Sequence, residues 1–367
     1  MHCITKDGIL KIDYYKSTIY DLLSLNKAIM KEAYLYQKLK EKKVRCGVCS
    51  HRCLISSGKQ GFCQVRENRG GKLYSLVYQK ACAKNVDPIE KKPLYHFQPG
   101  SHSLSIATVG CNFRCLHCQN WDISQYLLIS KTGAEILGED LPPKKIVEET
   151  IKNNCRSISY TYTEPTIFLE YALDTMKLAK DSDLKNIWVS NGYMTKKVIE
   201  MITPYLDAIN IDLKSSSEDF YQRYCSAHLA PVLENLKLLK KKKIHLEVTT
   251  LVIPTLNDSD KEFKEIADFI LQELGPKTPW HLSRFFPAYR ALTYPVTPLE
   301  TLIRAQKIGL KTGLKYVYLG NIADQIGNDT LCPKCNSLMI KRIGYKIERF
   351  DKDGYCSKCG TCLDIIE

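Results

Sequence analysis

The chain has 367 residues, of which 44% are hydrophobic and 25% are charged, the balance of an ordinary globular protein. This length allows one large domain with smaller additions. The opening residues contain no long apolar core and no stretch is long enough to span a bilayer, so we expect neither a secretory signal nor a membrane anchor and place the protein in the cytoplasm.

The formal net charge of +13 would suit a nucleic-acid partner. Most of the excess is lysine in runs at 40–43 and 240–243, at the ends of expected helices, where cations complement the helix dipole. We therefore favour a solvated surface over an RNA-binding one, without excluding nucleic acid as a partner.

The pattern changes three times along the chain. Residues 1–43 are predicted to be a leader and a helix over residues 17–42, because leucine and isoleucine recur at helical spacing. Residues 44–100 form a cysteine-rich N-terminal unit that ends in DPIEKKPLYHFQPGS, whose prolines and glycine predict an extended connector. Residues 101–328 alternate strands with helices, and residues 329–367 form a third unit with two CxxC pairs.

The central segment sets the fold class. Apolar runs predict strands at residues 104–109, 157–162, 186–190, 208–212, 245–253, 280–286 and 316–319, with helical patterns between them. Six or seven successive βα units predict an α/β fold with a parallel sheet, and crossovers of this length allow a partial (β/α)6 barrel of the TIM type.

Sixteen cysteines are too many to be incidental in a reducing compartment, where disulfides are a poor explanation. Eleven of them fall into three groups, which favours metal ligation. The remaining five are interpreted as ordinary small apolar residues: Cys3, Cys82, Cys155, Cys225 and Cys362.

The middle group lies in VGCNFRCLHCQNW, directly after the first strand of the central segment. Cys111, Cys115 and Cys118 can hold three irons of a cubane iron–sulfur cluster and leave the fourth iron open to a small molecule. A tetrahedral zinc site would need a further ligand, such as His117.

This CxxxCxxC spacing resembles the signature of radical S-adenosyl-L-methionine (SAM) enzymes. In that family the open iron of a [4Fe-4S] cluster binds SAM, and an electron from the cluster cleaves SAM to a 5′-deoxyadenosyl radical. The resemblance makes Cys111, Cys115 and Cys118 the cluster ligands and catalytic residues. Where the family usually has an aromatic carbocycle, this chain has His117, which we expect to contact the adenine of SAM.

Polar residues also follow the next three strands, and strand ends of a parallel barrel converge on one pocket. Lys214 suits the carboxylate of SAM, the turn at Thr163 and Glu164 suits its amino group, and Asn191 and Asp212 suit the ribose hydroxyls.

The motifs TYTEP, SNG and DLK look like the SAM-binding segments of pyruvate formate-lyase activating enzymes. The likeness fails at Val189, where those enzymes carry an acid for a monovalent cation, so we do not expect that cation here. Over residues 44–362 the chain resembles the AmmeMemoRadiSam-system radical SAM proteins, on CGVCSHRCLISSGKQGFC, VDPIEKKPLYHFQPGS, VGCNFRCLHCQNWDIS, PWHLSRFFPAY, YLGN and the terminal cysteine pairs.

The two outer cysteine groups predict further metal sites. The C-terminal pairs have zinc-ribbon spacing, with an iron–sulfur cluster or rubredoxin-like iron as the alternative, and consist of Cys332, Cys335, Cys356 and Cys359. The N-terminal group is less regular, so zinc, an auxiliary [4Fe-4S] cluster and a metal-free loop all stay open; it consists of Cys46, Cys49, Cys53 and Cys63.

The sequence thus predicts a radical SAM enzyme that abstracts hydrogen from an unidentified substrate and takes electrons from a ferredoxin or flavodoxin. Trp280, His281, Arg284 and Tyr289 are candidates for the substrate side. The alternatives are a glycyl-radical-enzyme activase, an RNA-modifying radical enzyme, and a non-catalytic metal-bearing scaffold for Memo-type and AMMECR-type proteins.

Overall fold

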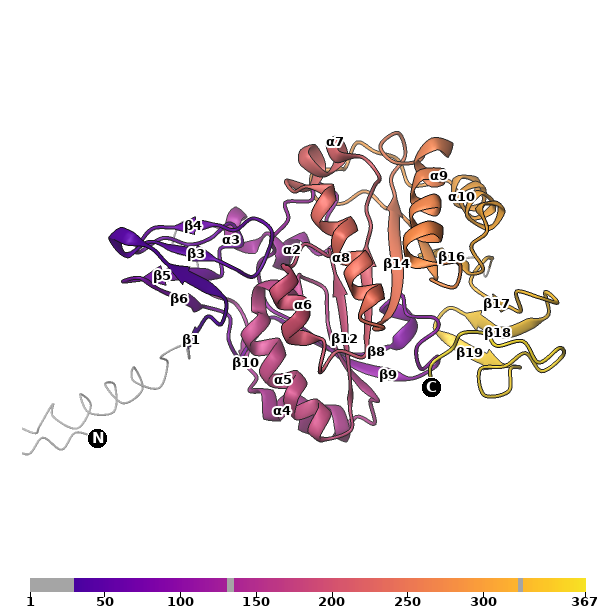
Figure 1. The fold of residues 1–367 in the computed structure, drawn as a ribbon, viewed down its shortest axis with the longest axis horizontal. Coiled ribbons are helices and arrows are strands. Elements are labelled where there is room, and N and C mark those ends of the chain that lie inside the picture. Colours follow the sequence, from indigo (N-terminus) through magenta and orange to yellow (C-terminus); the bar gives the residue numbers. More distant parts are fainter. Residues whose placement is uncertain (1–29, 131–134, 323–325) are drawn as a thin grey trace, which may run out of the picture.

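The structure is a computed structural model that describes residues 30–130, 135–322 and 326–367. A central sheet lies between a small N-terminal β unit and a small C-terminal β unit (Figure 1). Every described helix is too short or too polar to cross a membrane.

The central sheet has eight strands in the order β16-β15-β14-β13-β12-β11-β9-β8. Seven of them are parallel, and only β8 (Ala83–Pro88) runs antiparallel, against β9 (His102–Ala107). The other six are β11 (Ser157–Tyr160), β12 (Lys185–Ser190), β13 (Ala208–Asp212), β14 (His245–Val252), β15 (Trp280–Arg284) and β16 (Val317–Gly320). The expected parallel sheet is confirmed. Its seven parallel strands match the upper end of the six or seven βα units expected from the sequence. The sheet is open, since β8 and β16 end the described strand order.

Helices follow these strands and cover one face of the sheet (Figure 1). The longer ones are α4 (Pro143–Lys152), α5 (Leu169–Asp181), α6 (Lys196–Ile202), α8 (Leu229–Lys241), α9 (Asp260–Phe269) and α10 (Leu299–Thr312). Short helical turns are α2 (Trp121–Ser124), α3 (Tyr126–Ile129), α7 (Glu218–Phe220), η3 (Pro165–Phe168), η4 (Tyr221–Cys225) and η5 (Ile270–Leu274). The lysine run at 240–243 does lie at a helix end, because α8 ends at Lys241.

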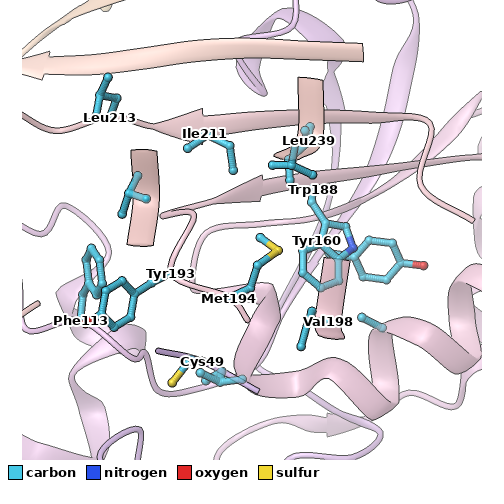
Figure 2. Close-up of a cluster of buried hydrophobic side chains, with 14 of the residues drawn as sticks. Cys49, Phe113, Tyr160, Trp188, Tyr193, Met194, Val198, Ile211, Leu213 and Leu239 are labelled. Carbon is cyan, nitrogen blue, oxygen red and sulfur yellow. The ribbon is translucent and has the colours of Figure 1, made fainter. Parts of the chain in front are cut away.

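Large side chains fill the layer between sheet and helices. Trp188 and Tyr160 are fully buried and lie close to Val198 of α6 and Leu239 of α8 (Figure 2). Gly309 lets α10 approach β15, since a Cβ there would lie 3.1 Å from the Trp280 ring. Successive side chains of a strand point to opposite faces, so the other face carries polar residues such as Ser103 and Ser159, whose hydroxyls lie 2.6 Å apart.

The helix expected over residues 17–42 is wrong in its described part, and residues 17–29 lie outside the described residues. Residues 31–42 form β1 (Lys31–Glu32), β2 (Tyr36–Lys38) and a 3-10 turn, η1 (Lys40–Lys42). β1 pairs with β6 (Lys72–Ser75), which also pairs with β5 (Arg66–Arg69). β2 pairs with β3 (Val44–Cys46), which also pairs with β4 (Leu54–Ile55). Strand partners outside the segment override its helical spacing.

Residues 88–101, here called the strap, are the segment predicted from their prolines to be an extended connector, and they are largely buried. The strap begins with the turn η2 (Ile89–Lys91) and buries Ile89, Leu94 and Phe97 against Ile187 of β12 and Ala208 of β13. Its apolar residues therefore pack on the face of the sheet opposite the helices. Prolines fix the bends of the strap without making it solvent-exposed.

The C-terminal unit is a three-stranded antiparallel sheet of β17 (Thr330–Leu331), β18 (Leu338–Ile343) and β19 (Lys346–Arg349). It contacts the strap directly: the Arg342 guanidinium donates to the Tyr95 carbonyl at 2.9 Å, and the Ile366 N–H donates to the His96 carbonyl at 2.8 Å. A two-stranded pair of β7 (Lys80–Ala81) and β10 (Glu139–Asp140) completes the described strands.

Candidate active site

The three predicted cluster cysteines line one cavity of about 470 Å³ at the carboxyl edge of the sheet. Their loop, residues 108–120, leaves β9 and is held by backbone hydrogen bonds from Arg114 N–H to the Cys225 carbonyl at 2.9 Å and from Leu116 N–H to the Tyr224 carbonyl at 3.0 Å. Gly110 has φ of +93°, and a Cβ there would meet the Cys63 carbonyl at 2.9 Å. These contacts fix the path of the loop around its three cysteines.

The spacing of the sulfurs separates this loop from the C-terminal cysteines. Sulfurs that share one zinc ion lie about 3.8 Å apart, from a Zn–S bond of about 2.3 Å in a tetrahedron. In the described residues the sulfurs of Cys332, Cys335, Cys356 and Cys359 all lie within 4.8 Å of one another, and two pairs are at 3.6 Å. The sulfurs of Cys111, Cys115 and Cys118 do not form such a compact group, which suits a larger cluster better than a single ion.

Burial raises the pKa of Cys111 and raises the pKa of Cys118 to about 11. The pKa of Cys115 is also raised, first by a hydrogen bond with Cys225 and then by burial. Cysteine binds a metal as the thiolate, so cluster assembly at these residues would release their protons.

His117 is buried at this site, and neither of its ring nitrogens has a hydrogen-bond partner among the described residues. Burial lowers the pKa of His117 to about 3, assisted by Lys214, so the ring is neutral. A buried polar group without a partner is costly and indicates a missing ligand. The site therefore has room and unmet polar capacity for a cofactor.

Cys225, interpreted from the sequence as an ordinary apolar residue, lies in the same place. Its sulfur and the ligand atoms of Cys115 and His117 are within 4.8 Å of one another. It comes from η4, more than a hundred residues from the triplet, so no spacing rule could have found it. At this cavity, these three residues could also hold a single ion in place of a cluster.

Glu164 lies at the end of β11, lines the cavity and clamps two loops together. One carboxylate oxygen accepts from the Thr166 N–H at 3.0 Å and the Ser190 hydroxyl at 2.9 Å, and the other accepts from the Asn191 N–H at 2.8 Å. Burial raises the pKa of Glu164, although these donors oppose the rise. Its first role is thus to fix the relative positions of the loops after β11 and β12.

The side chains of Thr163 and Asn191 also tie loops together. The Thr163 hydroxyl donates to the Thr108 carbonyl at 2.8 Å. The Asn191 amide donates to the side-chain oxygen of Asn112 at 2.7 Å, and its own oxygen accepts from the Tyr193 N–H at 3.0 Å. The residues expected from the sequence thus meet at one cavity, but several already have internal partners.

Asp212 and Lys214 lie at the end of β13, 3.0 Å apart. Burial opposes the charge of Lys214, but Asp212 prevails and raises the lysine pKa well above its ordinary value. The Tyr221 hydroxyl and the Asn257 amide hold the backbone of Lys214 at 3.1 Å and 2.7 Å. A fixed cation of this kind can receive a ligand carboxylate.

The candidates for the substrate side are dispersed. Trp280 is fully buried among the sheet and its helices, and His281 donates to the Glu247 carboxylate at 2.6 Å. Arg284 donates to the Thr297 carbonyl, and Tyr289 stacks on Trp121 with ring centroids 5.5 Å apart. Of β15, only Ser283 lines the cavity.

The N-terminal cysteine unit packs against the cluster loop. The His51 ring is 2.7 Å from the Asn112 carbonyl, and Arg114 donates to the Phe62 carbonyl with its guanidinium 4.1 Å from the Phe62 ring centroid. The Ser50 N–H donates to the Tyr193 carbonyl at 2.9 Å. Figure 2 shows Cys49 close to Phe113 and Tyr193, where this unit meets the loops of the site. The sequence alone gave no sign of this contact.

Comparison with known proteins agrees with the site. The profile of the radical SAM superfamily matches residues 105–270. The uncharacterized protein MJ0808 of Methanocaldococcus jannaschii is 44% identical over 340 residues, which cover 92% of this chain and 100% of that protein. The (2S)-3-sulfopropanediol dehydratase activating enzyme of Klebsiella oxytoca is 24% identical over 62% of this chain and 71% of that enzyme.

A solved structure, a radical SAM methyltransferase from Sphaerobacter thermophilus, has a TM-score of 0.49 and 10% identity over 84% of each chain. The superfamily carries a [4Fe-4S] cluster and SAM, and the triplet with its strand-end residues lines one cavity in this chain. The chain therefore belongs to the radical SAM superfamily and is an enzyme with relatives among the activating enzymes.

Proposed function

We propose that Cys111, Cys115 and Cys118 hold the [4Fe-4S] cluster, and that this enzyme cleaves SAM reductively to abstract hydrogen from a substrate in the same cavity. The observation that carries the proposal is the shared cavity: the three cysteines line it together with Glu164, Asn191, Asp212 and Lys214 from the ends of three further strands. A cluster held by these cysteines would supply the electron needed to break the sulfonium bond of SAM.

The chain's own residues bind and orient SAM. Lys214 receives its carboxylate, and Asp212 keeps the lysine charged and aimed. Glu164 and Asn191 hold the loops whose backbone carbonyls and remaining lone pairs receive the amino group and ribose. His117 and Thr163 complete the wall, with the neutral imidazole beside the adenine.

We also propose that the open sheet forms a partial barrel around this cavity. Residues 329–367 are an addition to it, while residues 44–100 contain most of the N-terminal β unit and also β8 of the central sheet. A one-electron donor of the ferredoxin or flavodoxin type would supply electrons to the cluster in the cytoplasm. The name of one relative, a putative glycyl-radical enzyme activating enzyme of Methanocaldococcus jannaschii that is 24% identical over 61% of this chain, favours activation of a glycyl radical enzyme as the specific reaction. The AmmeMemoRadiSam assignment and Memo-type or AMMECR-type partners remain part of this proposal, on the sequence resemblance alone.

The outer cysteines support different metals. The sulfur spacing of Cys332, Cys335, Cys356 and Cys359 fits zinc, since two pairs lie at 3.6 Å. In the described residues, Cys46, Cys49, Cys53 and Cys63 contain no three sulfurs within 4.8 Å of one another, which fits a [4Fe-4S] cluster or a metal-free loop better than zinc. Metal analysis of the anaerobically purified protein measures both.

The central test is anaerobic reconstitution with iron, sulfide, dithionite and SAM, followed by measurement of 5′-deoxyadenosine. We expect Cys118→Ala to lose product formation down to the background of protein-free samples. Cys155→Ala, which removes a buried cysteine outside the site, should retain it. Equal product from wild type and Cys118→Ala, or none from wild type, would reject the proposal and favour a scaffold.

Two further measurements separate the reaction classes. A glycyl radical signal on a partner protein, dependent on SAM and on Cys118, would establish activation. Salt-sensitive binding of tRNA would instead favour an RNA substrate, because phosphate contacts release counterions.

A further inference from the structure

Two lysines of the strap line the same cavity as the cluster cysteines. Lys91 and Lys92 both belong to its wall. The Lys92 side chain is only 1% exposed, while that of Lys91 is 44% exposed. Nothing in the cluster or SAM chemistry proposed above uses either lysine, because Lys214 already provides a cation for SAM.

The charges around these lysines do not balance. One carboxylate, Asp87, serves both: its two oxygens lie 2.8 Å from the Lys91 ammonium and 2.6 Å from the Lys92 ammonium. The Tyr162 hydroxyl also donates to Asp87. Two cations against one anion leave one excess positive charge at the cavity wall, where the half-exposed Lys91 and the buried Lys92 share Asp87. An anionic ligand could pair with this excess charge.

Burial lowers the pKa of Lys92 to about 8, even though Asp87 opposes the shift. The protein therefore compensates this cation incompletely. An anion that binds next to Lys92 would supply the missing compensation.

Tyr162 connects the lysines to the cluster loop. Its ring lies under the Lys92 ammonium, 4.6 Å from the ring centroid, and its carbonyl accepts from the Asn120 amide at 2.8 Å. Tyr162 has φ of +62°, a conformation that costs energy for a non-glycine residue and tends to persist at functional sites. Asn120 is two residues from Cys118, so the lysines lie near the centre of the proposed chemistry.

A second observation indicates an empty polar place in the same wall. Thr249 of β14 is 6% exposed and lines the cavity, and its hydroxyl has no hydrogen-bond partner among the described residues. Ser283 of β15 also lines the cavity and is paired with Leu251 of β14, while Thr249 is paired with Asp212 of β13. These hydroxyls can donate to a ligand in the cavity.

From this arrangement we propose that Lys91 and Lys92 form the substrate subsite, which binds the carboxylate or phosphate group of a small anionic substrate. The inference rests on the proposed function, because it places the substrate in the same cavity as the cluster and SAM. SAM binds at Lys214 and the cysteines, and the anion binds at the strap. The competing explanation is that both lysines serve only to neutralise Asp87.

The test measures binding of inorganic phosphate and of succinate by calorimetry, with the reconstituted enzyme saturated with SAM and with chloride as the reference salt. We expect saturable binding of at least one probe, weakened at least tenfold in Lys92→Met and in Lys91→Met. Lys91 is half-exposed, so Lys91→Met still tests anion binding even if Lys92→Met, at a buried position, prevents folding. Preference for phosphate or succinate identifies the group.

Lys144→Met is the matched control, because Lys144 is exposed on α4 and pairs only with Glu148. It should bind the probes as wild type does. Equal affinity in wild type and both strap variants, or no binding beyond that of chloride, would overturn the subsite. If 5′-deoxyadenosine is absent but the lysine-dependent binding persists, the proposed reaction fails while the anion subsite stands.

Discussion

The two outer cysteine groups have four cysteines each, but the units that carry them meet opposite edges of the sheet. The N-terminal unit touches the loops at the carboxyl edge, through His51 and Ser50. The C-terminal unit touches the strap near the start of the strands, through Arg342 and Ile366. In parallel α/β proteins the carboxyl edge carries chemistry and the amino edge carries stability. Similar cysteine counts can therefore serve different purposes, and the edge decides which.

The sharpest test of this contrast is Cys356→Ser. It removes one of four closely spaced sulfurs, and structural zinc provides about 10–16 kcal/mol of apparent binding free energy in small zinc domains. We expect loss of most bound zinc and proteolysis within residues 330–367, with cluster assembly and 5′-deoxyadenosine formation per folded protein kept. Zinc analysis and limited proteolysis measure the result, and Cys362→Ser, outside the group, is the control. Loss of the iron–sulfur absorbance in Cys356→Ser would show that the C-terminal unit also supports the cluster site, against the proposed division between the two edges.

The second largest effect is expected at acid pH, where contacts at the amino edge of the sheet should contribute less to the free energy of unfolding. His96 bridges the strap to the C-terminal unit, 3.0 Å from the Leu363 carbonyl and 2.6 Å from the Tyr318 hydroxyl. Burial lowers its pKa to about 4, opposed by Glu247. The unfolded chain takes up this proton below about pH 6.5 and the folded chain does not, so stability falls by up to about 3 kcal/mol as the pH falls from 6.5 to 4.

The free energy of unfolding against pH, from denaturant titrations, checks this expectation. His96→Asn cannot titrate and should show a shallower loss towards acid. His102→Asn changes an exposed histidine and should keep the wild-type slope. Identical slopes in wild type and His96→Asn would remove His96 from the account.

The carboxyl edge should respond in catalysis more than in stability. Cys49 forms a β-bridge with Met194, next to the loop that carries Asn191. We expect Cys49→Ser to leave the zinc content unchanged and to lower the rate of 5′-deoxyadenosine formation about tenfold, equivalent to about 1.4 kcal/mol. Cys82→Ser, a cysteine outside the three groups, should have the wild-type rate. A normal rate with a lost N-terminal metal would make this unit purely structural.

The smallest expected effect comes from one hydrogen bond. His51→Phe removes the contact with the Asn112 carbonyl but keeps a ring against Phe62 and Tyr193, whose centroids are 4.3 Å and 5.0 Å away. We expect a loss of about 1 kcal/mol in unfolding free energy and a rate reduced severalfold at most. Denaturant unfolding and the product assay are compared in the same preparation. An unchanged protein in both would show that this bond does not tie the two units.

The sequence by itself determined the elements and the local chemistry. The alternation of apolar runs predicts the parallel strands to within a few residues, because each buried strand needs a continuous apolar run. The spacing of Cys111, Cys115 and Cys118 is likewise local, since three thiols on one loop remain neighbours in any fold. The strand-end motifs follow from the rule that parallel strands present their carboxyl ends on one side.

Only the tertiary structure decided the long-range contacts. Cys225 reaches Cys115, the strap brings Lys92 to the cavity, and residues 31–38 join strands instead of a helix. Each depends on a partner far away in the chain, and neither periodicity nor motif spacing records which distant segments pack together. Burial and charge balance are properties of that packing, so the excess charge beside Asp87 exists only in the folded chain.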